Sequence, residues 1–126
     1  MSREELDYQG HFASICVPLK KTDKDFVFLP DAKEDEVVVF QFSNYKLFEK
    51  YVYADFIYEI AEKCHVDFLG RYESDTLMPD VLPTAIEIVS KAIEQRKNAA
   101  IKVYLEKTKE FMELAISLDT FIQFDL

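Results

Sequence analysis

Residues 44 to 64, NYKLFEKYVYADFIYEIAEKC, contain neither glycine nor proline and are too long to form a single β-strand. Asn44 or Ser43 can cap the start of this segment, because amide and hydroxyl oxygens accept hydrogen bonds from the free N–H groups of a first helical turn. The segment is therefore predicted to be helical. Since short apolar runs precede it, the chain is constrained to a mixed α+β fold.

The polar side of this helix changes direction halfway along it. Lys46 and Lys50 mark the polar side of the first half, whereas Asp55 and Glu59 mark a side turned by more than a quarter of a circle. Two arrangements account for this pattern: a central helix covered on more than one side, or two shorter helices with a break near Tyr53. In both arrangements, one or two tyrosines of the segment should reach the surface.

Short runs rich in β-branched and aromatic residues predict the strands. Three of them precede the helix, HFASICV at 11–17, DFVFL at 25–29 and EVVVFQF at 36–42, and polar turn-forming segments separate them. They predict a three-stranded antiparallel meander. HVDFLGRY at 65–72 predicts a fourth strand, and the alternating FIQFDL at 121–126 predicts a last strand at the sheet edge.

Two apolar stripes predict helices in the last third of the chain. Pro83 lacks an amide hydrogen, which suits the first turn of a helix, and an N-cap at Asp80 would make it the third helical residue. Apolar residues then recur at spacings of three and four up to Gln95. Residues 96–98 interrupt this stripe, and a second one covers 101–118. A helical hairpin is predicted, with one long helix as the alternative.

The size and composition of the chain agree with one domain. Its 126 residues are 49% hydrophobic and 14% aromatic, which is enough to fill one core. We predict a single α+β domain over residues 1–126, in which an antiparallel sheet of four to five strands packs against a long central helix and a C-terminal helical pair.

Cysteine usage and hydropathy point to the cytoplasm. Cys16 and Cys64 both lie in hydrophobic surroundings, which predicts two reduced, buried thiols. The opening MSREELDYQG lacks the apolar core of a secretory signal, so no signal peptide is expected. No stretch approaches the roughly 20 apolar residues that a membrane-spanning helix needs. We therefore expect a cytoplasmic protein.

The net charge restricts the class of partner. The 24 acidic and 15 basic side chains give a formal charge of −9. This charge repels nucleic acid phosphates and anionic membrane surfaces, and it attracts a basic partner. Neither nucleic acid nor a membrane is therefore expected as a partner. A negative charge also keeps a small protein soluble, which is the simpler explanation for part of it.

Two groups of acidic residues lie in predicted connections, at 31–36 and at 73–80. Solvated loop charge is the simplest interpretation, but if the two connections meet at one end of the sheet they form a negative docking surface. The helix adds an aromatic and acidic surface of the kind found in protein interfaces. The predicted partner-binding residues are Asp31, Glu34, Asp35, Glu36, Tyr53, Asp55, Glu73 and Asp75.

The motifs of common enzyme classes are missing. Gly10 and Gly70 are the only glycines, so no glycine-rich phosphate loop and no GxSxG nucleophile elbow occur. Cys64 and His65 are adjacent, and neighbours on a strand point to opposite faces, which is poor geometry for a thiol and its base. The CxxC and HxxxH spacings of metal sites are absent. We expect no catalysis, cofactor or metal, with a small carboxylate-dependent enzyme as the alternative.

The run CHVDFLGRYESDTLMPDVLPTAIEIVSKAIE, followed by a helix and the short FIQFDL, resembles small bacterial immunity proteins of polymorphic toxin and contact-dependent growth inhibition systems. The resemblance covers roughly the C-terminal half and lies in the layout and in the stretch YESDTLMPDVL. It implies a cytoplasmic protein that binds and neutralises one cognate toxin, often a nuclease, and it assigns no binding residue. The alternative is a non-enzymatic adaptor or structural subunit whose exposed tyrosines mediate homodimer or complex assembly.

Overall fold

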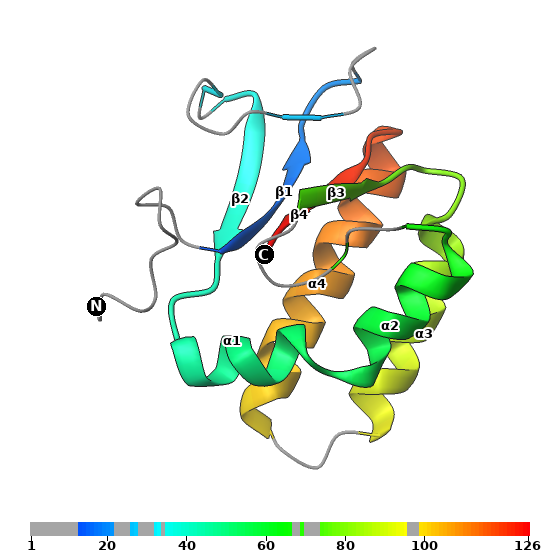
Figure 1. Ribbon diagram of the computed structural model, residues 1–126. Coiled ribbons are helices and arrows are strands. Elements are labelled where there is room, and N and C mark those ends of the chain that lie inside the picture. The colour runs from blue at the N-terminus through cyan, green and yellow to red at the C-terminus, as the bar shows by residue number, and fades with distance from the viewer. Residues whose placement is uncertain are drawn as a thin grey trace.

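A computed structural model places the strands in one antiparallel sheet and gathers the helices below it (Figure 1). The structure describes residues 13–21, 26–27, 32–33, 35–66, 69, 74–95 and 99–126. In these residues the elements are β1 (Ser14–Pro18), β2 (Val37–Gln41), α1 (Tyr45–Val52), α2 (Asp55–Lys63), β3 (Ser74–Leu77), α3 (Leu82–Gln95), α4 (Ala99–Leu118) and β4 (Ile122–Asp125). The predicted α+β class and antiparallel sheet are confirmed.

The sheet has the strand order β2-β1-β4-β3, and all neighbouring pairs are antiparallel. FIQFDL forms β4 as predicted, but this strand lies between β1 and β3, so its predicted position at the sheet edge is wrong. The physical reason is burial on both faces: Ile122 and Phe124 point into the core, and Gln123 on the other face is also fully buried. Strands buried on both faces belong in the interior of a sheet.

The predicted N-terminal strands have different outcomes. The run 11–17 overlaps β1 and the run 36–42 contains β2, and these two strands pair directly with each other. The run 25–29 between them lies mostly outside the described residues. The run 65–72 also lies mostly outside them, and the described strand nearest to it is β3, which begins at Ser74.

One side chain of β4 binds the backbone of a residue that lies before β2 in the chain. The Gln123 amide oxygen accepts a hydrogen bond from the Val27 N–H, and the Gln123 amide nitrogen donates to the Val27 carbonyl, both at 2.8 Å. An amide side chain carries one acceptor and a donor group, so it can satisfy both backbone groups of one residue. These two bonds fix Val27 against the sheet face that points away from the core helices.

The long helix predicted from Asn44 onward is broken at Tyr53 and Ala54 into α1 and α2. This is the second of the two predicted arrangements. Asn44 is the N-cap of α1, because its side-chain oxygen accepts the Leu47 N–H at 3.1 Å. The break lets each helix turn its own apolar side inward, which a straight helix with this sequence cannot do. Tyr53 and Tyr58 reach the surface, as predicted, with 58% and 65% of their area exposed.

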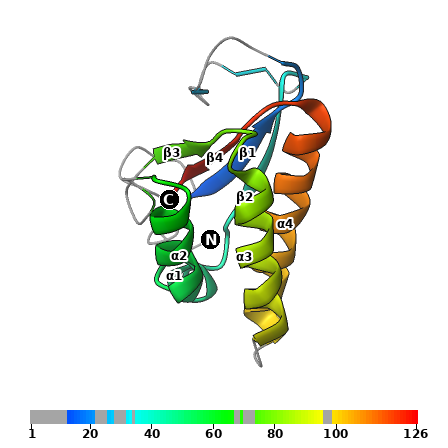
Figure 2. The same ribbon diagram turned by 90° about the vertical axis from the view of Figure 1, so that its right-hand side faces the viewer.

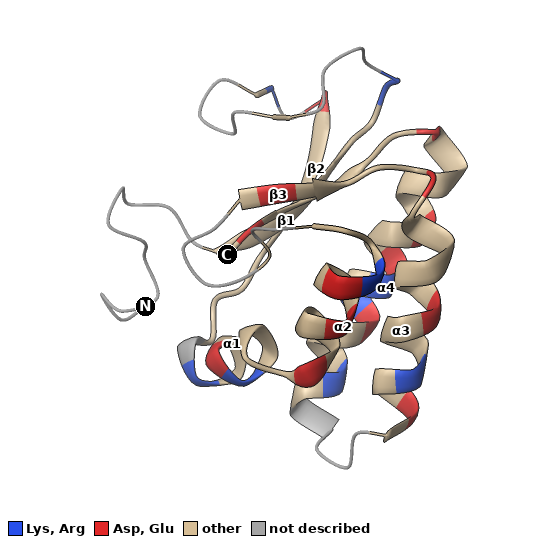
Figure 3. Cartoon of the chain, turned by 45° about the vertical axis from the view of Figure 1, so that its right-hand side comes forward, with Lys and Arg blue, Asp and Glu red and all other residues tan. Residues whose placement is uncertain are grey.

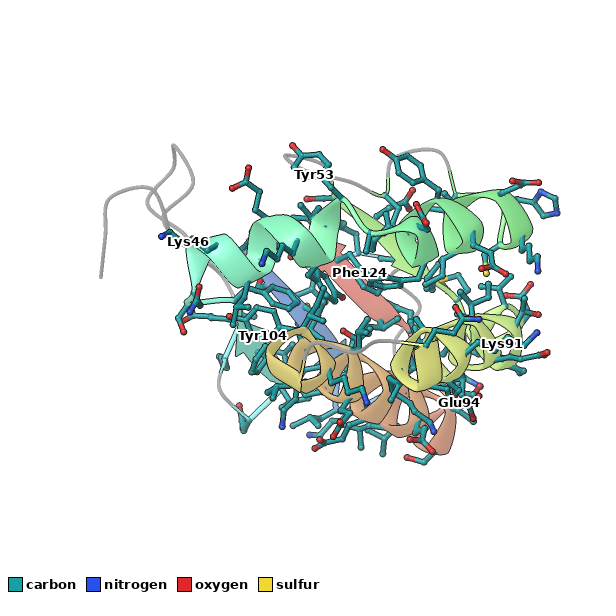
Figure 4. All side chains as sticks on the ribbon, turned by 90° about the horizontal axis from the view of Figure 1, so that it is seen from below. Lys46, Tyr53, Lys91, Glu94, Tyr104 and Phe124 are labelled. Carbon is teal, nitrogen blue, oxygen red and sulfur yellow. The ribbon has the colours of Figure 1, made fainter. Side chains whose placement is uncertain are left out.

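An aromatic cluster joins β2, α1 and α4. The buried Phe42 ring has its centre 4.7 Å from Tyr51, 4.9 Å from Tyr104 and 5.2 Å from Phe48. In Figure 4, Tyr104 lies on the side of α4 that faces α1. The hydroxyl of the fully buried Tyr51 is 2.7 Å from that of Thr108, so its polar group is satisfied inside the core.

The C-terminal helical pair is confirmed, and Figure 2 shows α3 and α4 side by side. Asp80 is not the N-cap of α3, which corrects the prediction. A turn in which the Val81 N–H bonds the Met78 carbonyl carries the chain one residue further, and the Val81 carbonyl accepts the Ala85 N–H. Pro83 is therefore the second helical residue, where its missing N–H would have no partner within the helix.

Two helices end in left-handed residues other than glycine. After α2, His65 has a φ of 56°, and the next N–H, that of Val66, bonds the Ala61 carbonyl at 3.0 Å. Asp119, after α4, has a φ of 55°. The hydrogen bond from Val66 makes the end of α2 a Schellman motif, in which glycine is the usual left-handed residue because it has no Cβ.

Replacing His65 by glycine is expected to raise the free energy of unfolding by about 0.5–1 kcal/mol. The substitution removes the left-handed strain of about 1–2 kcal/mol, part of which is offset by the greater freedom of glycine in the unfolded chain. Urea unfolding followed by circular dichroism measures the change. His65→Ala keeps the Cβ atom and is the matched control, so equal stability of the two variants would contradict the assignment of strain.

Candidate functional site

The structure describes part of the predicted partner-binding set. Asp31, Glu34 and Glu73 lie outside the described residues. Asp35 and Glu36 are exposed in the turn that precedes β2, and Asp75 lies in the edge strand β3. Tyr53 and Asp55 lie at the junction of α1 and α2, and both are exposed.

The sheet keeps the described acids of the two predicted groups apart. Glu36 precedes Val37, which pairs with Pro18 at one end of β1. Asp75 lies in the same row of the sheet as Ile15, near the other end of β1. β2 and β3 are also opposite edge strands. The described residues therefore do not form one continuous acidic surface from these two groups.

A different acidic surface lies along the outer side of α2. Tyr58, Glu59 and Glu62 follow Asp55 by three, four and seven residues, so the four side chains share one side of the helix. Figure 3 shows the acidic residues of α2 along this side. Together with Tyr53, these four residues are named the α2 face. Tyr58, Glu59 and Glu62 were not among the predicted binding residues, although their helical spacing with Asp55 is visible in the sequence.

The aromatic part of the α2 face is open to solvent. Figure 4 shows Tyr53 pointing away from α3 and α4. Its ring and that of Tyr58 are more than half exposed, although most large apolar side chains of the described residues are buried. Exposed tyrosines beside carboxylates are typical of protein interfaces, because a rigid ring loses little entropy when it docks.

The electrostatic surroundings of Lys63 show the sign of the electrostatic potential in this region. Its ammonium donates to Glu59 at 2.9 Å. This hydrogen bond is the main cause that raises the pKa of Lys63, and the negative charges of Glu59, Glu87 and Glu62 raise it further. Carboxylates of both α2 and α3 therefore contribute to a negative potential at this side of the molecule.

A groove of about 370 Å³ lies between α2 and α3 beside the α2 face. Its lining residues are Asp55, Phe56, Glu59, Ile88, Lys91, Ala92 and Gln95. Phe56, Ile88 and Ala92 are buried and form an apolar floor, whereas the charged side chains of the lining are at least partly exposed. The groove thus combines an apolar base with a charged rim.

A second hollow, of about 480 Å³, lies where α2 ends and α3 begins. It is lined by Cys64, His65, Val66, Asp75, Thr76, Met78, Asp80 and Val81. The Cys64 thiol donates to the Val81 carbonyl at 3.8 Å, and burial, with the charge of Asp80, raises its pKa. A raised pKa keeps the thiol protonated and makes it a poor nucleophile. No group of three or more His, Cys, Asp or Glu within the described part could hold a metal ion.

The α2 face and its groove are the surface features with the clearest binding chemistry. None of the helices in the described ranges has the length and apolar character needed to cross a membrane. No protein-family model, curated protein or solved structure matches the chain, so the functional inference rests on the surface chemistry of the described residues.

Proposed function

We propose that this chain is a cytoplasmic immunity protein that binds one basic protein toxin and neutralises it, with the α2 face as the docking surface. The observation that carries the proposal is the α2 face itself, on which Tyr53 and Tyr58 stand beside the carboxylates of Asp55, Glu59 and Glu62. The resemblance of the C-terminal half to immunity proteins supports the toxin assignment, and the choice of docking surface rests on the α2 face alone.

The mechanism follows from the charge of a toxin that acts on nucleic acid. Such a toxin needs a basic surface to bind phosphates, and an acidic helix face competes for that surface. Long-range attraction speeds the encounter, and the burial of the two tyrosines then slows dissociation. An inhibitor of this kind blocks the toxin without making or breaking a bond.

The proposal is tested with the product of the reading frame directly upstream, produced with and without this chain. We expect the upstream toxic domain alone to stop growth, and co-production of this chain to restore it through a complex that can be purified. Growth arrest that persists in the presence of this chain would contradict the toxin assignment.

The docking surface is tested by charge reversal. The variant carrying Asp55→Lys, Glu59→Lys and Glu62→Lys is expected to associate with the toxin about tenfold more slowly, with a flatter dependence on salt. Stopped-flow association over a series of salt concentrations measures both effects. The exposed glutamates of α4 provide a matched control, in which Glu106, Glu110 and Glu113 are changed to lysine.

Because both triple variants change the net charge equally, a difference between their association rates reports the position of the interface. Equal rates would contradict the α2 face as the docking surface. A fast α2 variant combined with a slow Asp35→Lys/Glu36→Lys variant would move the interface to the turn before β2.

The competing function is an adaptor that acts through a homodimer. The exposed Tyr53 and Tyr58 favour some form of assembly, but a symmetric dimer through the α2 face would bring like charges together. We therefore expect a monomer in sedimentation velocity over a concentration series. A tight dimer in which the α2 charge reversal alters the dissociation constant would favour the adaptor.

A further inference from the structure

We infer that the α2–α3 groove is a subsite for one arginine side chain of the partner, held by Asp55 and Glu59 and opposed by the positive charge of Lys91. This inference rests on the proposed function, because it states what a basic partner inserts beside the α2 face.

The shape of the groove suits a long side chain with a charged end. Phe56, Ile88 and Ala92 form a buried apolar floor, against which the methylene groups of an arginine can pack. Asp55 and Glu59 lie one helical turn apart on the rim, so their carboxylates can both reach one guanidinium group. The planar guanidinium has five N–H donors in a fixed fork and can bridge two carboxylates, whereas a lysine ammonium acts as a compact point charge.

The carboxylates of the rim are available to a partner. Asp55 forms no salt bridge with another described residue. Glu59 pairs with Lys63, but the two side chains are 43% and 53% exposed, and solvent-exposed pairs of this kind contribute little and exchange readily.

The groove also contains one cation of the chain itself. Lys91 lines the groove, and its ammonium lies 3.4 Å from Glu87, one turn before it on α3. This pair draws Lys91 along its own helix, which leaves the carboxylates of α2 on the opposite rim. A partner arginine that enters the groove is therefore repelled by the positive charge of Lys91, and the removal of the lysine charge should favour binding.

The test is a titration of the protein with N-acetyl-arginine amide, followed by backbone amide chemical shifts. We expect shifts concentrated at the groove residues of α2 and α3. N-acetyl-norleucine amide has an aliphatic stem without the charge and is expected to cause much smaller shifts. Equal shifts with the two probes, or arginine shifts spread evenly over the acidic residues of all helices, would overturn the subsite.

Three single variants test the expected direction of the change in affinity for the probe. Asp55→Asn should lower the affinity of the protein for the arginine probe about 2- to 5-fold, and Lys91→Gln should raise this affinity by a similar factor. Glu62→Gln is the matched control on the same helix face outside the groove lining, and it should change the affinity by less than about 2-fold. A weaker affinity in Lys91→Gln, or an unchanged affinity in Asp55→Asn, would overturn the inference.

The arginine subsite and the proposed function can be contradicted independently of each other. If the probe does not bind but the α2 charge reversal still slows association with the toxin, the subsite is wrong and the docking surface stands. If the probe binds with the expected signs but this chain neither binds nor neutralises the upstream toxin, the subsite stands and the toxin assignment is wrong.

Discussion

Replacement of Phe42 by alanine is expected to lower the free energy of unfolding by about 3–5 kcal/mol. The Phe42 side chain is fully buried, and its ring meets those of Phe48, Tyr51 and Tyr104, which belong to two different helices. Truncation leaves a cavity at the point where β2, α1 and α4 join, and this rigid aromatic cluster cannot collapse to fill it. Small domains have a total stability of only about 5–15 kcal/mol, so this variant should be close to unfolding at room temperature.

Urea unfolding at equilibrium measures this loss, provided that the variant still folds. Phe42→Leu keeps most of the buried volume and should lose less stability, which makes the cavity measurable even if the alanine variant is unfolded. Phe26→Ala removes a ring that is about half exposed and is the control for a simple loss of apolar area. A loss in Phe42→Ala no larger than that in Phe26→Ala would contradict the central role of this ring.

Stability is expected to fall steeply above pH 9. Burial, and to a lesser extent the negative charge of Asp125, raises the pKa of Cys16 from 9.0 to about 12. Between these values the folded protein keeps a proton that the unfolded chain loses. The contribution of the protonated thiol to the free energy of unfolding is therefore fully present below about pH 9. Above that pH it decreases by about 1.4 kcal/mol per pH unit, to a loss of about 4 kcal/mol at pH 12. Burial also raises the pKa of Tyr51, although its hydrogen bond with Thr108 opposes the shift.

Urea unfolding at a series of pH values from neutral upward measures this dependence. Cys16→Ala removes the ionisable group, so its stability should decrease less steeply with pH than that of the original chain, whatever its stability at neutral pH. Cys64→Ala is the matched control, because the less buried thiol of Cys64 should have a smaller effect on the slope. An unchanged slope in Cys16→Ala would show that the buried thiol does not cause the alkaline loss.

Much of the fold could be predicted because its signals are local. A capping side chain at Asn44 or Ser43 placed the start of α1, the missing N–H of Pro83 placed the start of α3 within one residue, and alternation identified β4. The position of β4 inside the sheet could not be predicted in this way. It depends on the burial of Gln123, a polar residue whose partner, Val27, is far away in the sequence.

The candidate site could be predicted only in part, for the same reason. Tyr53 and Asp55 were predicted because a helix with two polar directions must expose some aromatic residues. The groove beside them required the packing of α2 against α3, and no local pattern brings Ile88 or Lys91 next to Asp55. The predicted meeting of the two acidic connections depended on the strand order, which places Glu36 and Asp75 at opposite edges of the sheet.

The ladder between β1 and β4 has a consequence for the nascent chain. It joins Ser14 to Asp125, so the sheet cannot close until the ribosome has made nearly all of the described residues. Until then, the apolar side chains of β1 have no strand on one side, and chaperones have time to bind them. If the protein protects its host from a toxin made at the same moment, protection begins only after this late step of biogenesis.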